Sequence, residues 1–426
     1  MINRYMAPPV RPTDKPEILQ AEKTRLDNGI PVYSLRAGTQ DVCKIDFIFE
    51  AGSWQQTNQL EAALCNAMLQ EGSRLYSAPR IAEIFDFHGA YLQLSANQHD
   101  GLISIISLTR HLPELMPVIE DFIKRPTFPQ HEFETLVQRR KQRFLLENEK
   151  VKVLCQKEFS TLLFGKGHPY AQTVKAEDFD LIQRESLLSF YDRFYHAGNC
   201  EILLAGRFDD HVERLLNAHF GGSDWLQIKH ADPAFQVNPS VMKQLHFPKA
   251  DSIQSAIRIG KILVNKSHPD YLPLQILVTI LGGYFSSRLM ANIREEKGYT
   301  YGIGASFISL KELGYLVIST EVDKSYTENT VAEIFNEMEK LKQEAVGESE
   351  LDRVRQYLLG EFVRDLDGPF ALAQAFRNVH DFGLDYTFYD RYYQSLMQVS
   401  PARLQQLAQK YFDQDSFYTV VAGSLT

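Results

Sequence analysis

The sequence has few cysteines, no long apolar run and no excess of positive charge. Its four cysteines are widely separated and form no CxxC pair, so we expect free thiols in a reducing compartment rather than a disulfide framework. No stretch reaches the roughly 18 apolar residues that a membrane span needs. The 45 Lys and Arg against 54 Asp and Glu give a net charge of −9, which argues against a nucleic-acid-binding protein.

The beginning of the sequence lacks the apolar segment of a secretory signal peptide. We therefore expect a cytoplasmic protein, with the periplasm as the alternative.

The common catalytic and binding motifs are also missing. There is no P-loop, no GxSxG turn and no EF-hand loop, and the twelve histidines form no HExxH, HxxEH or HxH. His211 and His219 share one face of an expected helix, but they are two turns apart, too far for one metal ion.

What the 426 residues do contain is a repeat. Residues 185–207 resemble residues 400–424, and the alignment places Gly206 on Gly423, 217 positions later. Each copy has the pattern of an amphipathic helix followed by a buried strand that ends in Ala-Gly. Residues 88–98 match residues 297–307 at an offset of 209. Two pairs in the same order favour two homologous domains over chance similarity.

Each half interleaves strands and helices. The first-half strands are expected near residues 31–36, 44–51, 90–97 and 101–108. The helices are expected near residues 57–71, 78–88, 110–124, 130–163 and 184–196. The last two strands are joined by only Gln98-His99-Asp100, which predicts an antiparallel hairpin and hence an α+β fold with mostly antiparallel sheets.

A segment without periodicity separates the two halves. Residues 221–250 carry Gly, Pro and Asp clusters, which are typical of a linker, and we place the linker at 223–250. We therefore expect an N-terminal domain over 1–222 and a C-terminal domain over 251–426.

The segment 281–307 carries the most distinctive chemistry. Arg294 near the end of a helix and Tyr301 on the following strand are seven residues apart across a glycine turn, so they can converge on one point. Two strong hydrogen-bond donors together suit a carbonyl oxygen or a developing oxyanion. The alternative is an exposed Arg294 paired with Glu295 or Glu296 and a Tyr301 packed in the sheet.

Several of these segments together resemble the pitrilysin/insulinase-type zinc metallopeptidases, particularly the two-domain mitochondrial-processing-peptidase branch. The similarity runs nearly end to end. The matching segments are LDNGIPVYSLRAG (26–38), FHGAYLQLSANQHDGLISI (87–105), IEDFIKRPTFPQHEFE (119–134), FGKGHPYAQTV (164–174) and LGGYFSSRLMANIREEKGYTYGIGASF (281–307). The resemblance implies the family's fold, with two domains that each pack a mostly antiparallel sheet against helices.

The family's catalytic motif is missing. Its HxxEH supplies two zinc ligands and a general base, but in register with MLQEGS (68–73) this sequence has Ala63-Leu64-Cys65-Asn66-Ala67. The third ligand is expected near Gln142 or Arg143, neither of which is a zinc ligand. Cys65 alone is a weak soft ligand and is better explained as a small packed residue. We therefore expect no metal in this chain and no peptidase activity of the chain alone.

The resemblance assigns Arg294 and Tyr301 a role in trans. In relatives built from two subunits, one chain carries HxxEH and the other carries the Arg/Tyr pair. The expected function is therefore that of a non-catalytic subunit of a processing-type zinc metalloendopeptidase, paired with an HxxEH-bearing chain that holds the zinc. Ser95 and Asn97 lie where active relatives bind peptide by strand addition.

Two alternatives stay open. One is a structural or assembly protein of the same fold, in a hetero-complex or self-associated. The other is an independently active metalloendopeptidase with atypical ligands.

Overall fold

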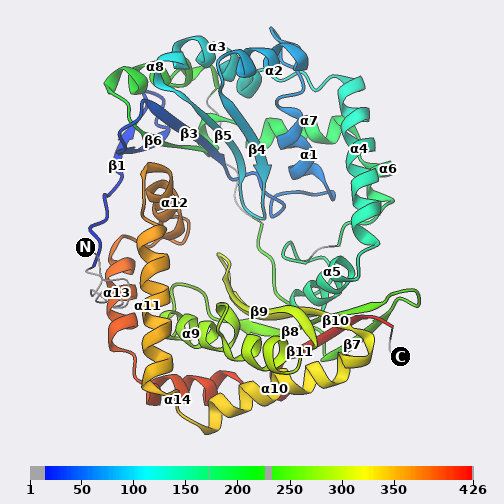
Figure 1. The fold of residues 1–426 in the computed structure, drawn as a ribbon. Coiled ribbons are helices and arrows are strands. Elements are labelled where there is room, and N and C mark those ends of the chain that lie inside the picture. The colour runs from blue at the N-terminus through cyan, green and yellow to red at the C-terminus, as the bar shows by residue number, and fades with distance from the viewer. Residues whose placement is uncertain (1–14, 172, 226–232, 425–426) are drawn as a thin grey trace, which may run out of the picture.

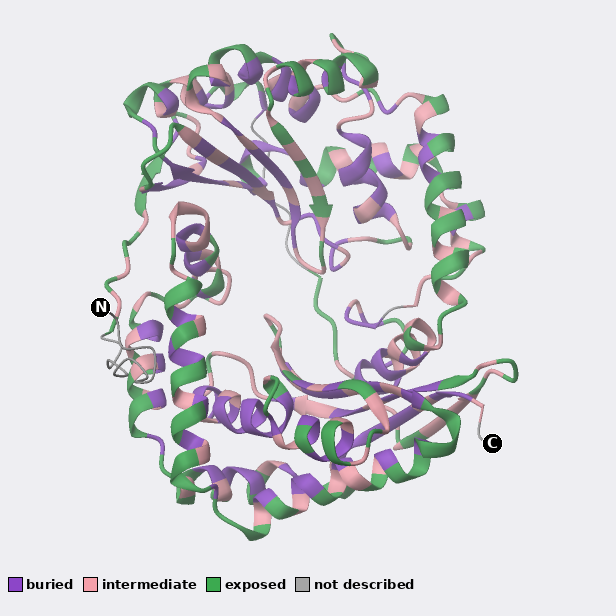
Figure 2. Cartoon of the chain, viewed as in Figure 1, coloured by how far each residue is buried: buried purple, intermediate pink, exposed green. Residues whose placement is uncertain are grey.

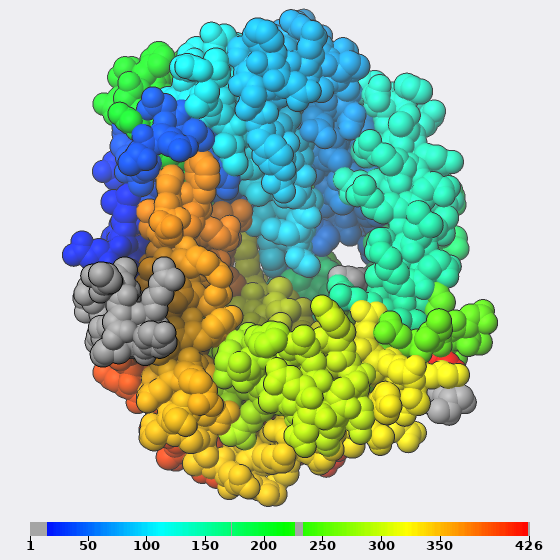
Figure 3. All heavy atoms as spheres, viewed as in Figure 1, coloured from blue at the N-terminus to red at the C-terminus, as the bar shows by residue number. Residues whose placement is uncertain are grey.

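The computed structural model describes residues 15–171, 173–225 and 233–424. The chain forms two domains, each a sheet covered by helices, that face each other across a central space (Figure 1). Two long helices, α4 (Gln130–Asn148) and α11 (Glu348–Arg364), run along opposite sides of this space. The space-filling view shows an opening between the first domain and the cyan-green α4 segment (Figure 3).

The first sheet has six strands. In their side-by-side order they are β1 (Glu22–Arg25), β2 (Pro31–Arg36), β6 (Cys200–Gly206), β3 (Val42–Phe49), β5 (Gly101–Leu108) and β4 (Tyr91–Ala96). Only β2 and β6 pair in parallel. The predicted hairpin is confirmed, because β4 and β5 pair antiparallel with Ala96 opposite Gly101. β4 is an edge strand with one unpaired side.

The second sheet repeats this order with five strands. They are β7 (Gln244–Pro248), β11 (Tyr418–Gly423), β8 (Gln254–Leu263), β10 (Gly314–Asp323) and β9 (Thr300–Ser309). The parallel pair β7–β11 corresponds to β2–β6, and the edge strand β9 corresponds to β4. The predicted α+β class with mostly antiparallel sheets is therefore confirmed.

Local details of the two halves also match. β6 and β11 each follow a helix, α7 (Arg184–Phe194) or α14 (Pro401–Tyr411), and each ends at a glycine with positive φ, Gly206 or Gly423. Gly89 and Gly298 both adopt left-handed φ, +58° and +66°, just before β4 and β9. Glycine adopts this conformation at little cost, so the two halves share the same turn and the same preference for glycine in it.

The remaining helices lie on the sheets or connect them. In the first half they are α1 (Glu61–Met68), α2 (Ala78–Phe87), α3 (Leu112–Lys124), α5 (Val151–Phe164), α6 (Asp178–Leu181) and α8 (Asp210–Phe220). In the second half they are α9 (Tyr271–Val278), α10 (Thr327–Gln343), α12 (Pro369–His380) and α13 (Thr387–Gln398).

The single helix predicted over 130–163 is wrong. The chain forms α4 and α5 with a break at Glu149 and Lys150, and Lys150 has an extended backbone. No proline or glycine marks the break. It arises because α5 leaves the first domain and packs its apolar face against the second sheet, where Phe159 and Leu163 join Val317 and Val420 in one buried cluster.

The second domain returns a helix to the first. Leu372, Ala373 and Phe376 of α12 pack on Leu35 and Leu203, on the face of the first sheet opposite its main core. The two halves therefore exchange one helix each: α5 covers the second sheet and α12 covers the first.

The segment 223–250 is structured at both ends. Trp225 is buried in the first core, and β7 is a strand of the second sheet. Residues 226–232 lie outside the described residues. The connection between the domains is therefore shorter than the predicted linker.

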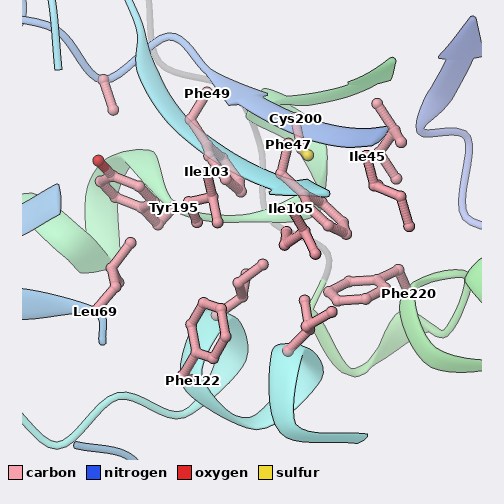
Figure 4. Close-up of a cluster of buried hydrophobic side chains, with 14 of the residues drawn as sticks. Ile45, Phe47, Phe49, Leu69, Ile103, Ile105, Phe122, Tyr195, Cys200 and Phe220 are labelled. Carbon is pink, nitrogen blue, oxygen red and sulfur yellow. The ribbon is translucent and has the colours of Figure 1, made fainter. Parts of the chain in front are cut away.

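Buried residues concentrate in the two sheets and the helices against them, whereas α4 is largely exposed (Figure 2). In the first core, side chains of β3 and β5 meet Phe122 of α3 and Phe220 of α8 (Figure 4). Strand side chains alternate between the two sheet faces, so Ile202 and Leu204 enter this core while Leu203 and Ala205 contact α12.

No helix among the described residues is long and apolar enough to cross a membrane.

Candidate functional site

The α1 segment borders a cavity of about 530 Å³ between the first sheet, α4, α5 and the loop around residue 170. Ala63 contributes only a methyl group to its wall, and Ala67 is nearly buried. A methyl group has no lone pair to offer a metal ion. The two positions where the motif of the resembling family has histidines therefore provide packing surface only.

Asn66 is a buried, hydrogen-bonded residue of the first domain's core. Its side chain is 1% exposed, and its Nδ2 donates to Tyr195 Oη at 3.1 Å and weakly to the Leu102 carbonyl oxygen at 3.4 Å. Burial raises the pKa of Tyr195 well above its usual range, so the phenol stays neutral. The amide is thus held by partners inside the sheet, at the position where a general base was expected from the resemblance.

Cys65 is fully buried in the same helix. Burial raises the pKa of its thiol well above the ordinary value, with the Glu61 and Asp192 carboxylates adding to the effect. A thiol that keeps its proton is a poor metal ligand and a poor nucleophile. The packing interpretation of Cys65 agrees with this environment.

The third ligand position is occupied by an aromatic ring. Gln142 and Arg143 are exposed and do not line the cavity, whereas Phe144, one residue further along α4, does. Lys157 of α5 places its Nζ 5.5 Å from the centre of that ring. Burial lowers the pKa of Lys157. The cavity also contains Glu147 and His168, but among the described residues neither belongs to a group of three His, Cys, Asp or Glu side chains that could share an ion, so this site does not fit zinc.

An aromatic group centred on Trp54 stands behind the other wall of the cavity, which its members His168, Tyr170 and Phe235 line. The Trp54 ring contacts the rings of His99, His168, Tyr170 and Phe235, with centres 4.9–5.6 Å apart. Tyr170 Oη lies 2.9 Å from His99 Nε2 and accepts from the Glu312 amide of the second domain at 3.3 Å. Burial raises the pKa of Tyr170 to about 12, which keeps this link uncharged.

His168 presents an unused donor beside this wall. It is 5% exposed, and burial lowers its pKa, so the ring is neutral at pH 7. Its Nδ1 accepts from the Tyr170 amide at 3.2 Å, which leaves the proton on Nε2. Nε2 has no hydrogen-bond partner among the described residues. The atom is itself buried, so it is a hydrogen-bond donor left unsatisfied inside the protein.

Sequence reasoning did not predict this wall. Residues 54, 99, 168 and 235 are far apart in the chain and meet only in the folded protein. The HPY segment at 168–170, used above only for the resemblance, was the one available signal.

Ser95 and Asn97 have different environments. Ser95 is exposed on edge strand β4, as expected. Asn97 begins the hairpin turn: its amide donates to the Asp100 carbonyl oxygen and its own carbonyl oxygen accepts from the Ser53 amide. Asn97 also lines the cavity, so it shapes the end of β4 rather than extending the free edge.

Arg294 and Tyr301 do converge. Arg294 lies in the last turn of a π-helical segment, Met290–Glu296. Its guanidinium carbon is 5.6 Å from the centre of the Tyr301 ring and 4.8 Å from that of Phe285. Tyr301 is 93% exposed and Phe285 is 63% exposed. Within the described residues, Arg294 forms no ion pair with Glu295, Glu296 or any other carboxylate. The alternative of a paired arginine and a packed tyrosine therefore does not describe this geometry.

A second arginine in the same segment behaves differently. Arg288 donates to both carboxylate oxygens of Glu350, at 3.0 and 2.9 Å. Such a two-point contact fixes Arg288 as part of the fold. Arg294 keeps its donors available beside an exposed ring, and Tyr301 also borders a hollow of about 280 Å³ with Lys152 and Arg258.

Comparisons with known proteins agree with this fold. The family described as "Insulinase (Peptidase family M16)" matches residues 32–162, and "Peptidase M16 inactive domain" matches residues 181–358. An "Uncharacterized zinc protease" of Rickettsia felis is 24% identical over 79% of this chain and 81% of its own. A protein of Helicobacter pylori named "Non-peptidase homolog YmxG" is 22% identical over 72% of each chain. A solved structure of a peptidase M16 inactive domain from Pseudomonas fluorescens has a TM-score of 0.84 at 22% identity, covering 95% of this chain and 98% of that one.

Proposed function

The chain belongs to the M16 (insulinase) family of peptidases, and from that premise we propose that it is the non-catalytic subunit of a two-chain metalloendopeptidase. The first domain of this homologue lacks the family's zinc-binding motif. In the proposed complex a partner chain carries HxxEH and zinc, and this chain binds the peptide and contributes Arg294 and Tyr301.

One observation carries the proposal. Arg294 has no carboxylate partner among the described residues and lies against the exposed rings of Tyr301 and Phe285, whereas nearby Arg288 is held by Glu350. The guanidinium of Arg294 and the phenol of Tyr301 are hydrogen-bond donors on the surface that do not hold the fold together. They suit the carbonyl oxygen of a peptide held on an opposing chain, where negative charge develops during cleavage.

The first domain supports peptide binding without cleavage. The cavity beside Ala63 is lined by the aromatic residues Phe144, Tyr170 and Phe235, which suits an apolar side chain of a peptide. The free edge of β4 leads to this cavity, so an extended peptide added along Ser95 would direct its side chains there.

Reconstitution with an HxxEH-bearing family member that copurifies with this chain tests the proposal. We expect cleavage of a fluorogenic peptide only when both chains are present. Arg294→Ala in this chain should lower kcat by about a hundredfold or more, as loss of an oxyanion donor does. Tyr301→Phe, which removes only the hydroxyl, should act in the same direction.

The matched control is Arg80→Ala, because Arg80 is an exposed arginine of α2 that pairs only with Glu83. It should leave kcat and KM unchanged, and gel filtration should show that every variant still forms the complex. Unchanged turnover with Arg294→Ala would contradict the catalytic contribution. Stable association without peptidase activity in any combination would instead identify an assembly protein.

A further inference from the structure

Three potential metal ligands meet at the open end of the β4–β5 hairpin, away from the cavity. His88 directly follows α2, His111 directly precedes α3, and Glu114 lies in the first turn of α3. One ligand atom from each lies within 4.8 Å of the other two. Among the described residues, this is the one group of three His, Cys, Asp or Glu side chains that meets this distance.

The backbone holds the first ligand in place. The His88 amide donates to the Ile84 carbonyl oxygen at 3.2 Å, and the Ala90 amide donates to that of Phe85 at 2.9 Å. Gly89 between them has the left-handed φ of +58° that this helix ending requires. His88 therefore sits on a closed turn whose position the fold fixes.

The other two ligands are fixed by the packing of α3. Leu112 and Leu115 are fully buried and anchor the first turn of the helix to the core. His111 and Glu114 are three residues apart, so both project from the opposite, accessible side. The three side chains are thus brought together by core packing rather than by contacts among themselves, which lowers the ordering cost of binding an ion.

The ligand set selects a class of ion. Two imidazoles and one carboxylate suit zinc and related divalent transition metals, whereas calcium and magnesium prefer oxygen ligands alone. The rings of His88 and His111 are 5.0 Å apart at their centres. Arg110 Nε donates to His111 Nε2 at 3.4 Å, a long bond that the ion displaces, because a neutral ring that binds a metal through Nδ1 carries its proton on Nε2.

We propose that His88, His111 and Glu114 bind one zinc-like divalent cation, with water completing the coordination. The ion joins the end of α2 to the start of α3 and has a structural role. This inference is independent of the proposed peptidase function and differs from the expectation that the chain holds no metal. It places the metal on the surface of the first domain, apart from α1.

Zinc titration of the full chain tests the site. After treatment with a chelator, the protein is titrated with Zn²⁺ in competition with a chromophoric chelator. We expect one equivalent per wild-type chain, and a higher melting temperature when zinc is bound, because the ion binds the folded state. Both effects should disappear in His88→Ala and His111→Ala and weaken in Glu114→Gln.

Two histidine variants serve as controls. His131→Ala removes an exposed histidine of α4, and His211→Ala removes one member of the histidine pair on α8. Both should retain one equivalent. The proposal fails if the wild type binds no stoichiometric zinc, or if a His88→Ala, His111→Ala double variant still binds one equivalent. Several weak equivalents that no variant alters would show adventitious surface binding and would also overturn it.

Discussion

Asn66 in the first domain and Arg294 in the second lie in opposite environments. Asn66 is buried and hydrogen-bonded inside the core, whereas Arg294 lies at the surface against exposed rings without a carboxylate partner among the described residues. The same repeated fold thus has a buried, hydrogen-bonded amide at the first position and an accessible guanidinium at the second. A change at the first should therefore alter stability, and a change at the second should alter only interactions with other molecules.

This comparison assumes that the two domains stabilise each other through the exchanged helices. The contact between α12 and the first domain offers the largest test of that assumption. Arg377 of α12 donates to the buried Asp100 of the first domain at 2.7 Å. Arg377→Leu leaves that carboxylate with Lys311, 3.6 Å away, and a weak hydrogen bond from Asn97 Nδ2 at 3.4 Å. We expect the free energy of unfolding in urea to fall by about 3 kcal/mol.

Arg364→Leu is the control for this variant, because Arg364 forms an exposed pair with Glu361 on α11. Its loss should cost less than about 1 kcal/mol. Equal effects of the two substitutions would mean that the two domains are stable without the contact between α12 and the first domain.

The second test compares the two sites directly. Asn66→Ala removes the hydrogen bond to Tyr195 and leaves a buried hydroxyl without it, so we expect a loss of about 2 kcal/mol. Arg294→Ala should change the free energy of unfolding by no more than about 0.5 kcal/mol. Both values come from urea unfolding curves. A comparable loss from Arg294→Ala would show that this arginine is a structural residue.

The third test asks whether duplicated turns carry equal costs. Gly89 and Gly298 share a left-handed backbone, and nothing lies within 4 Å of a Cβ added at either. Gly89→Ala and Gly298→Ala should therefore each cost about 1 kcal/mol, from backbone strain alone. Gly347→Ala, at a glycine without positive φ and with equally open space, should cost less. Unequal losses of stability for Gly89→Ala and Gly298→Ala would show that the two turns, although matched by the repeat, are not energetically equivalent.

The smallest effect concerns pH. Burial lowers the pKa of His168, so the unfolded chain takes up a proton near pH 6.5 while the folded chain does not. This residue's contribution to stability is complete above about pH 6.5 and falls as the pH drops from there to the folded pKa. His168→Gln should therefore lose less stability than the wild type between pH 7.5 and 5.5. The exposed His131→Gln should follow the wild type.

The sequence predicted features that depend on neighbouring residues. The repeated helix–strand units, the hairpin around residues 98–100 and the meeting of Arg294 with Tyr301 across Gly298 all follow from local pattern and short spacing. The break at Glu149 and Lys150 was missed because it carries no local signal: tertiary packing of α5 on the second sheet decides it. The cavity wall around Trp54 was missed because its members meet only through the fold.

The exchange of α5 and α12 between the two domains has a consequence for folding during synthesis. During synthesis the first sheet emerges complete after Gly206, but the helix that covers its outer face ends only at His380. Until then Leu35 and Leu203 lack the cover of α12. Likewise α5 precedes the strands on which it packs, because β8 begins only at Gln254, 90 residues after Phe164. A gene fragment cut at the midpoint leaves each product with one bare sheet face and one helix without a partner, so the duplicated units mature together or not at all.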